Sequence, residues 1–408
     1  MARKKNGKKV FSRKINIAQL HWGFPPIIGG VETHLTIIMP EMVKRGHRVS
    51  LLTGSVEGSK LVDSYKGVKI YRTPLMDLNW LAKRGVSGLE GDVGKALSNF
   101  FDKVKPDIIH AHNMHYFSKP HTEVLEKYAG KHRIPLILTA HNVWDDLMFL
   151  DLTRNVKWNH IIAVSHFIKR ELMGAGIDDR KITVIHHGID TKIYRPNINT
   201  DKILKAYPQL KGKRVIFHPA RMGLAKGCDV SIKALNLVKQ RFPDVMLVLA
   251  GTKNIIDWGG THQKDIAYMV NLVKIFNLEK NVLIDSFTLD EVAELYGVAK
   301  VCMYPSSSGE PFGLTMLESL SSAKPIIVTD SGGMPEIIQD GITGYVIPIK
   351  DFEVLASRII QVLSDDRLRN RLGYTGRQIV EKSYSKETVT KATLHVYRNA
   401  MKRLKLLL

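Results

Sequence analysis

Apolar residues fall into short runs that alternate with longer stretches of helical periodicity along the whole chain. In the longer stretches, such as residues 30–44 and 93–104, apolar positions recur with the helical period. This alternation is typical of α/β units built on a parallel sheet. The strand-like runs of the first half are INIAQL (15–20), RVSLLT (48–53), DIIHA (107–111), PLILTA (135–140), HIIAV (160–164) and ITVI (182–185).

The strand pattern stops in the polar stretch 191–213 and then starts again. The runs of the second half are RVIFHP (214–219), MLVLAG (246–251), VLID (282–285), VCMY (301–304), PIIVTD (325–330) and GYVIP (344–348). We therefore predict two doubly wound parallel-sheet domains. The predicted organisation is a basic tail over 1–14, domains over 15–200 and 201–385, and a basic helix over 386–408 that packs back across the domain junction.

Composition places the chain among ordinary globular proteins. Its 408 residues are 44% hydrophobic and 24% charged, which suits two separate cores. No apolar run has the length of a membrane span, and the N-terminus lacks the apolar segment of a signal peptide. Cys228 and Cys302 have neither disulfide nor metal-ligand spacing around them. We therefore expect a reduced, cytoplasmic protein.

The formal charge of +21 predicts attraction to anionic partners. Lysines and arginines cluster at both ends of the chain, over 3–14 and 402–405. Neither cluster interleaves aromatic residues with its charges, so we expect no nucleic-acid partner. Two readings stay open, a solvated lysine-rich surface and a peripheral contact of the basic termini with the inner membrane face.

The stretch SSSGEPFGLTMLE (306–318) is the most specific candidate site. It predicts a loop that carries Glu310, a helix that begins at Phe312, Gly313 and Leu314, and Glu318 one turn inside this helix. The backbone amides suit phosphate or sugar oxygens, and Glu318 suits a ribose diol. Glu310 would orient a sugar hydroxyl and stabilise positive charge at an anomeric carbon. The alternative is that both glutamates are only helix-start acids. The whole stretch suits a nucleotide sugar.

Two glycine-containing loops after predicted strands add candidates. Arg221 and Lys226 flank the loop after RVIFHP, and two cations there suit a diphosphate, although they also fit a solvated surface. Gly29 and Gly30 open a helix after the first strand, where a phosphate or sugar could approach the backbone, although a plain glycine turn explains them equally well. Gly332 and Gly333 open a predicted helix before Glu336. This glycine pair is explained either by a structural turn or by a contact with the ligand.

The end of PLILTA brings a histidine and two carboxylates together. His141 could hydrogen-bond a hydroxyl or stabilise developing charge, or be a satisfied structural histidine. Asp145 and Asp146 could bind an acceptor's hydroxyl or amino groups, or begin a helix. The chain has no Asp-x-Asp pair, no GxGxxG and no Walker loop. We therefore predict no metal site and no obligatory cofactor, and neither a dehydrogenase nor a P-loop NTPase.

Together these motifs resemble the GT4 family of retaining glycosyltransferases with the GT-B fold. The resemblance covers nearly the whole chain and implies a hexosyltransferase of two facing Rossmann-like domains, with the donor bound to the C-terminal one and the acceptor to the N-terminal one. The segments that carry it are GGVETH, TAHN, VSHFIKREL, IHHGIDTKIYRP, RMGLAKGCD, SGGMPEII with GITGYV, and GEPFGLTMLE as the E-x7-E element.

The resemblance also implies residue roles. Arg221 and Lys226 grip the donor diphosphate, Glu318 holds the ribose, and Glu310 with the 312–314 backbone holds the transferred sugar. His141 contacts this sugar near the reacting carbon, and Gly29 with Gly30 lies against donor phosphate or acceptor. The implied reaction retains the anomeric configuration without an obligatory metal, and the leaving diphosphate helps to deprotonate the acceptor hydroxyl.

One departure narrows the resemblance. Many members have Asn before Gly-Ile/Val-Asp, where this chain has His186-His187-Gly188. IHHGID and AHNVWDD resemble transferases that glycosylate 2-deoxystreptamine in aminoglycoside antibiotic biosynthesis. This implies N-acetylglucosamine transfer from a UDP donor to an aminocyclitol beside Asp145 and Asp146. Two alternatives remain: a GT4 transferase for a membrane lipid or polysaccharide acceptor, and a non-catalytic binder of anionic glycans or nucleic acid.

Overall fold

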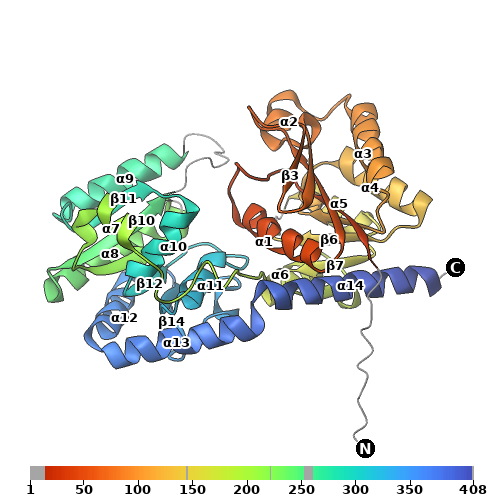
Figure 1. Ribbon diagram of the computed structural model, residues 1–408. Coiled ribbons are helices and arrows are strands. Elements are labelled where there is room, and N and C mark those ends of the chain that lie inside the picture. Colours follow the sequence, from red (N-terminus) through yellow and green to blue (C-terminus); the bar gives the residue numbers. More distant parts are fainter. Residues whose placement is uncertain (1–13, 144–145, 221, 252–260, 407–408) are drawn as a thin grey trace, which may run out of the picture.

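The computed structural model describes residues 14–143, 146–220, 222–251 and 261–406, which form two α/β domains (Figure 1). The N-terminal sheet has eight strands in the order β3-β4-β2-β1-β5-β6-β7-β8. Its pairs are parallel except for the antiparallel β3–β4 pair at one edge. The strands are β1 (Asn16–Leu20), β2 (Arg48–Gly54), β3 (Val62–Tyr65), β4 (Val68–Thr73), β5 (Ile108–His112), β6 (Leu136–Ala140), β7 (His160–Ala163) and β8 (Ile182–Val184).

Both faces of this sheet are covered, as the apolar runs predict. In β1, Ile17 packs into the same cluster as Leu35 of α1, whereas its neighbour Ala18 packs into the cluster that contains Leu97 of α3. Successive side chains of a strand point to opposite faces, so helices on both sides bury a continuous apolar run. The helices of this domain are α1 (Gly30–Lys44), α2 (Leu78–Arg84), α3 (Glu90–Val104), α4 (Lys119–His132), α5 (Leu147–Asn155) and α6 (His166–Gly174).

The C-terminal domain is built on a six-stranded parallel sheet in the order β11-β10-β9-β12-β13-β14. Its strands are β9 (Arg214–His218), β10 (Val245–Gly251), β11 (Val282–Ser286), β12 (Val301–Tyr304), β13 (Ile326–Thr329) and β14 (Gly344–Ile347). Its helices are α7 (Asp201–Ala206), α8 (Cys228–Arg241), α9 (Thr261–Ile275), α10 (Leu289–Val298), α11 (Leu314–Ser321), α12 (Phe352–Ser364) and α13 (Asp366–Ser383). The predicted α/β fold of two parallel-sheet domains is confirmed.

Three elements differ from the prediction. β3 and β4 were not expected, because neither contains an apolar run: β3 (VDSY) is mostly exposed, and β4 (VKIYRT) alternates apolar with polar residues. The predicted helix after Gly332 and Gly333 is wrong, since only one 3-10 turn follows, over Met334–Glu336.

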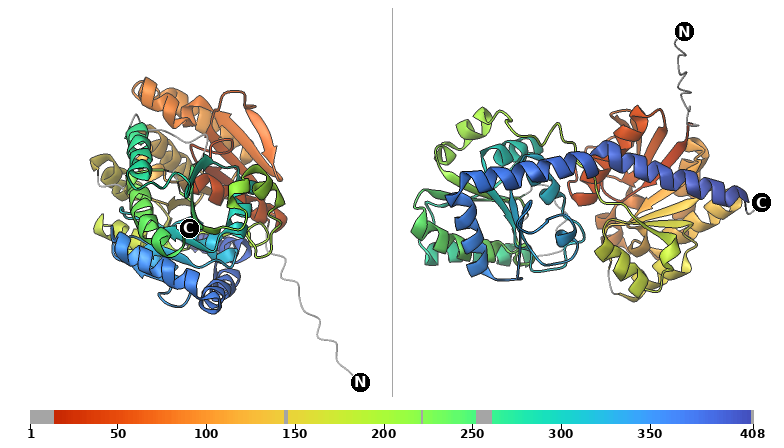
Figure 2. Two further views of the ribbon diagram at one scale, coloured as in Figure 1. Left: turned by 90° about the vertical axis from the view of Figure 1, so that its left-hand side faces the viewer. Right: turned by 90° about the horizontal axis from the view of Figure 1, so that it is seen from below.

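The last helix, α14 (Lys386–Leu406), runs from the C-terminal domain along the N-terminal one (Figure 2). The start of α14 lies beside the segment around Ile189, by which the chain leaves the N-terminal domain. Lys386 N donates to Ile189 O at 3.0 Å. Lys386 also pairs with Asp190. A Cβ at Gly188 would lie 3.1 Å from Val389 Cβ, so glycine permits this close approach.

Polar groups bind α14 to the sheet beneath it. The buried Tyr397 hydroxyl lies 2.6 Å from His110 Nδ1, and Gln19 Nε2 donates to the same hydroxyl at 3.1 Å.

Burial, with smaller contributions from neighbouring histidine charges, lowers the pKa of His34 and His110 from 6.5 to about 3. The same causes hold the pKa values of His112, His141 and His187 well below this ordinary value. All five imidazoles are therefore neutral at pH 7.

We expect the free energy of unfolding to fall steeply as the pH drops from 6.5 towards 3. The unfolded chain takes up protons at its histidines in this range, whereas the folded chain keeps these histidines neutral, so protonation favours unfolding. Each such histidine contributes up to about 1.4 kcal/mol per pH unit. Urea unfolding of wild type and His110→Asn between pH 7.5 and 4.5 should give a shallower pH dependence for the variant. His395→Asn, at an exposed position on α14, is the control. Stability that is flat from pH 7 to 5 would contradict this account.

Candidate functional site

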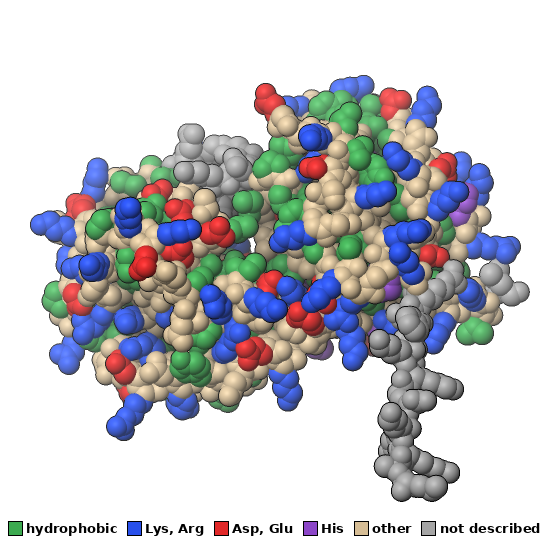
Figure 3. Space-filling view, in the orientation of Figure 1, with side chains coloured by type: hydrophobic (Ala, Val, Ile, Leu, Met, Phe, Trp, Pro, Cys, Tyr) green, Lys and Arg blue, Asp and Glu red, His purple; other side chains and the backbone are tan. Residues whose placement is uncertain are grey.

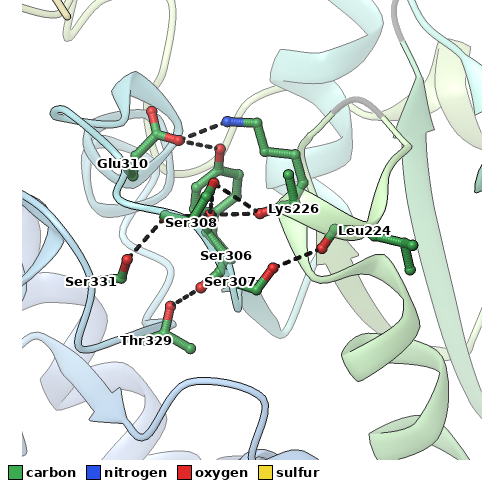
Figure 4. Close-up of polar contacts among 10 residues, drawn as sticks. Leu224, Lys226, Ser306, Ser307, Ser308, Glu310, Thr329 and Ser331 are labelled. Carbon is green, nitrogen blue, oxygen red and sulfur yellow. Dashed lines mark hydrogen bonds and ion pairs between the residues drawn. The ribbon is translucent and has the colours of Figure 1, made fainter. Parts of the chain in front are cut away.

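Two loops of the C-terminal domain meet beyond the ends of β9 and β12. Lys226 Nζ, from the loop after β9, lies 2.8 Å from Glu310 Oε2, from the loop after β12 (Figure 4). The Tyr304 hydroxyl donates to the same carboxylate oxygen at 2.8 Å, and its ring centroid lies 5.6 Å from the ammonium nitrogen. The structure therefore brings together two of the residues that were predicted separately from the sequence.

Backbone contact holds these loops together. Gly227 has a φ of 73°, and a Cβ there would lie 1.8 Å from Pro305 O. Only glycine fits this conformation and this distance. The serines of the second loop then donate to carbonyl groups around them: Ser307 Oγ to Leu224 O at 3.0 Å and Ser306 Oγ to Ala225 O at 2.9 Å (Figure 4).

A third segment supports the same loop from the other side. Thr329 Oγ1 donates to Ser306 O at 2.6 Å, and Ser331 Oγ donates to Ser308 O at 2.9 Å (Figure 4). A Cβ at Gly332 would lie 2.2 Å from Glu310 O, so a glycine is needed where these turns touch. The carboxylate of Glu310 is thus placed by fixed backbone rather than by a free loop.

Helix α11 begins at this point. Gly313 is its N-cap, with a φ of 87°, and the helix starts at Leu314. The N–H groups of the first turn of a helix have no acceptor within that helix and carry a partial positive charge, so they favour anionic oxygens. Phe312 is buried, at 1% exposure, and fixes the direction from which the chain enters the helix.

Glu318 lies one turn inside α11 and is buried, at 8% exposure. Its Oε2 accepts a hydrogen bond from the Tyr296 hydroxyl at 2.8 Å. Burial raises the pKa of this carboxyl, and hydrogen bonds from Tyr296 and Tyr194 act in the opposite direction. A carboxylate offers about four acceptor positions, so the two tyrosines leave capacity for a diol.

His141 lies at the end of β6, in the facing domain. Its backbone N–H donates to Asn113 Oδ1 at 2.7 Å. Both ring nitrogens are engaged: Nε2 lies 2.9 Å from His112 Nδ1, and Nδ1 lies 2.9 Å from His187 Nε2. The His187 ring in turn packs on Phe312, at 4.9 Å between ring centroids. His141 is therefore close to the C-terminal loops, and a contact with a sugar hydroxyl requires one of these histidine pairs to open.

Glu336 connects the two domains beside this site. Its carboxylate accepts the backbone N–H groups of His166 and Phe167, both at 2.7 Å, and so caps α6 of the other domain. His186 Nε2 lies 3.2 Å away. Burial alone would raise the pKa of Glu336, but these hydrogen bonds outweigh it and lower the pKa. Ser165 Oγ adds a bond to Pro311 O at 2.6 Å.

The remaining predicted residues are Gly29, Gly30, Asp145, Asp146 and Arg221. Gly29 caps α1, and a Cβ on it would lie 2.3 Å from Glu32 Oε2, whereas a Cβ on Gly30 would meet no atom within 4 Å. Asp146 is exposed directly before α5 and accepts the Leu150 N–H through its carbonyl, as a helix start does. Arg221 and Asp145 lie outside the described residues.

Sequence reasoning missed the histidines around His141. His110 and His112 occupy alternate positions of β5 and therefore point to the same face of the sheet, a signal that the sequence contains. Their partners come from distant segments, which the sequence does not reveal. Within the described part of the chain, no group of three or more His, Cys, Asp or Glu side chains is arranged to hold a metal ion. In the same residues, no helix is long and apolar enough to cross a membrane.

Family models match each domain separately. Residues 28–193 match Glycosyltransferase Family 4, and residues 199–379 match Glycosyl transferases group 1. An uncharacterised glycosyltransferase of Methanocaldococcus jannaschii is 24% identical over 95% of this chain and 99% of its own length. N-acetyl-alpha-D-glucosaminyl L-malate synthase of Bacillus anthracis is 22% identical over 92% of this chain and 96% of its own length.

Solved structures share the fold. Sucrose-phosphate synthase of Thermosynechococcus elongatus has a TM-score of 0.78 at 18% identity, over 95% of this chain and 99% of its own. The Anabaena protein HepE in complex with UDP and glucose has a TM-score of 0.75 at 19% identity, over 94% of this chain and 100% of its own. One family model matches each domain, and the solved structures share the GT-B fold. The chain therefore belongs to the GT4-type glycosyltransferases.

Proposed function

We propose that the protein transfers N-acetylglucosamine from UDP-GlcNAc to a hydroxyl of a small polyol or aminocyclitol, such as 2-deoxystreptamine. The observation that carries the donor site is the contact between Lys226 and Glu310 beside the N-terminus of α11. A cation, a carboxylate and a helix N-terminus converge there, and each suits one part of a nucleotide sugar.

Each group has a separate role in this proposal. Lys226 neutralises the diphosphate, together with Arg221 of the same loop, so that an obligatory metal ion is not needed for this purpose. The first-turn amides of α11 bind phosphate or sugar oxygens. Glu318 accepts hydrogen bonds from the ribose diol, and Glu310 orients a hydroxyl of the transferred sugar.

The proposed reaction retains the anomeric configuration. The bond between the anomeric carbon and the diphosphate oxygen breaks, and the acceptor oxygen forms its bond on the same face of the sugar. The acceptor proton passes to an oxygen of the leaving diphosphate. Glu310 stabilises positive charge that builds on the sugar, and Lys226 stabilises negative charge that builds on the leaving group.

The choice of substrates rests on relatives and on motifs. The name of the Bacillus anthracis relative specifies an N-acetylglucosaminyl group and a small acceptor, L-malate, and HepE was crystallised with UDP and glucose. The aminocyclitol comes from the IHHGID and AHNVWDD resemblance. The exposed carboxylate of Asp146, next to Asp145 in the chain, suits a cationic acceptor.

A second candidate, a transferase for a membrane lipid or polysaccharide, is favoured by one surface feature. A hollow of about 720 Å³ between α14 and the edge strand β8 is lined by Lys391, Arg398 and Arg403 and by no Asp or Glu. Apolar side chains of Val184 and Val396 line it as well. Lys and Arg side chains nevertheless lie over both domains on the face seen in Figure 3, as a generally basic surface would show.

Lys226→Ala should lower kcat by about 100-fold, because the leaving diphosphate loses a preorganised positive charge. The free energy of unfolding should change little, since the Lys226 side chain is 27% exposed and forms a single ion pair. Steady-state kinetics and urea unfolding measure the two effects. Lys233→Ala is the matched control, because it breaks a comparable pair with Asp229, at 3.0 Å, on α8. Equal losses of activity and stability in Lys226→Ala would count against the assigned role.

Glu318→Gln should weaken the binding of UDP and of UDP-GlcNAc by about 1 to 3 kcal/mol, since the ribose is common to both ligands and loses charged hydrogen bonds. The glutamine keeps an acceptor for the tyrosine hydroxyls, so the fold should survive. Calorimetric titration with UDP, GDP and ADP sugars would measure the effect and identify the base. Glu353→Gln, at an exposed position on α12, is the control. An unchanged dissociation constant of Glu318→Gln for UDP and UDP-GlcNAc would contradict the proposal that Glu318 binds the ribose.

With a small acceptor, we expect activity to be independent of membranes. Initial rates should be the same with phosphatidylcholine vesicles, with vesicles that contain phosphatidylglycerol, and without vesicles. A chain that lacks residues 1–12 should be as active as the full chain. Activity that requires anionic vesicles and is lost with the tail would favour the lipid acceptor instead.

A further inference from the structure

The hydrogen bonds that hold α14 and those around His141 form one continuous chain of hydrogen-bonded side chains, which we call the row. The connection is Gln19, whose Oε1 lies 2.7 Å from His112 Nε2 and whose Nε2 donates to the Tyr397 hydroxyl. At the far end, His110 Nε2 lies 2.6 Å from Thr139 Oγ1. The row runs in the order Thr139, His110, Tyr397, Gln19, His112, His141 and His187.

The bonds of the row have a common direction. A carboxamide oxygen only accepts, so Gln19 Oε1 requires an N–H on His112 Nε2. A neutral imidazole has one N–H and one acceptor nitrogen, so His112 Nδ1 accepts from His141 Nε2, and His141 Nδ1 accepts from His187 Nε2. On the other side of Gln19, Tyr397 accepts one proton and donates its own to His110 Nδ1. All four histidines then carry their proton on Nε2.

The end of the row favours this direction over its reverse. His187 Nδ1 is buried and has no hydrogen-bond partner among the described residues. In the direction described above, His187 Nδ1 is an acceptor without a donor. If every bond were reversed, the same nitrogen would carry a buried N–H without an acceptor. Among buried backbone groups, an unmet N–H donor is rarer than an unmet acceptor, and we take the same order to hold for this buried ring nitrogen. The His187 ring is also held in place, because it stacks on His34 at 4.5 Å and packs on Phe312.

We propose that Tyr397 and Gln19 are positioning residues for the transfer reaction. By holding the row in this direction, they keep His141 Nδ1 an acceptor at the domain interface, where a hydroxyl of the transferred sugar replaces His187 as its donor. The inference rests on the proposed function, because it takes His141 as a sugar contact. It adds that the C-terminal helix, through one hydroxyl group, determines how His141 meets the donor.

A consequence for specificity follows. The site selects a donor sugar with a free hydroxyl towards His141, because an analogue without this hydroxyl leaves the lone pair unmet once His187 has moved. A substitution that lets the Gln19 amide reverse would turn His141 Nδ1 into a donor and lose this selection. Tyr397→Phe does so, since it removes the acceptor that holds Gln19 Nε2.

Nitrogen NMR of the full chain with ¹⁵N-labelled histidine tests the direction of the row without any substrate. The wild type should show the Nε2–H tautomer at His110, His112, His141 and His187, assigned with single histidine variants. Tyr397→Phe should shift His112 and His141 towards a mixture of tautomers. An Nδ1–H tautomer at His141 in the wild type would overturn the inference, and so would unchanged tautomers in Tyr397→Phe.

Kinetics test the positioning role. Tyr397→Phe should lower kcat about tenfold, with a smaller change in the donor KM, because the contact is misplaced rather than removed. Tyr345→Phe, at a buried tyrosine of the C-terminal core, is the matched control and should leave kcat unchanged.

These measurements separate the two levels of the account. If Tyr397→Phe lowers only the melting temperature and leaves kcat unchanged, the tyrosine is structural and the positioning role fails. If the wild type transfers no sugar while the tautomers are as predicted, the proposed function fails and the row loses its assigned purpose.

Discussion

The site depends on one close backbone approach, between the loop that follows β9 and the loop that follows β12. These strands are neighbours in the sheet, and the absence of a side chain at Gly227 lets its loop touch Pro305 O. With the loops in contact, Lys226 and Glu310 come within hydrogen-bond distance, and α11 starts directly behind them. Opposite charges and a helix N-terminus are thereby placed at the carboxyl edge of a parallel sheet, where α/β folds bind ligands.

The N-terminal domain is held against this edge from two sides. Glu336 caps a helix of the other domain beside the site, and α14 crosses back to bury Tyr397 under the N-terminal sheet. The Glu336 contact is polar, whereas α14 also packs apolar side chains such as Leu394 and Val396 into the cluster that contains β1 and α1. Each contact includes a histidine, His186 for Glu336 and His110 for Tyr397. The interface between the domains thus combines hydrogen bonds with buried apolar side chains, among them Phe312 and Leu314 at the candidate site itself.

The fold, and the part of the candidate site that lies in the C-terminal domain, could be predicted from the sequence. Apolar runs predicted every strand except β3, an exposed edge strand, and β4, in which the buried Val68 and Ile70 alternate with polar positions instead of forming a run. The stretch from Glu310 to Glu318 predicted a loop and a helix N-terminus over Phe312, Gly313 and Leu314, and α11 starts at Leu314, because glycine and the helix start are local features. The histidine row was not readable, since its bonds join residues as distant as Gln19 and Tyr397 and depend on tertiary packing. The role of Glu336 between the domains was not predicted for the same reason, because its partners His166, Phe167 and His186 lie in the other domain.

The anomeric configuration of the product tests the central claim of sugar transfer most directly. The protein would be incubated with UDP-GlcNAc and 2-deoxystreptamine, then with other UDP, GDP and ADP sugars and hydroxyl acceptors, and the anomeric proton of any product followed by NMR. The account predicts an α-linked product, with the configuration of the donor retained. A β-linked product from UDP-GlcNAc, or no transfer from any nucleotide sugar in the panel, would contradict it.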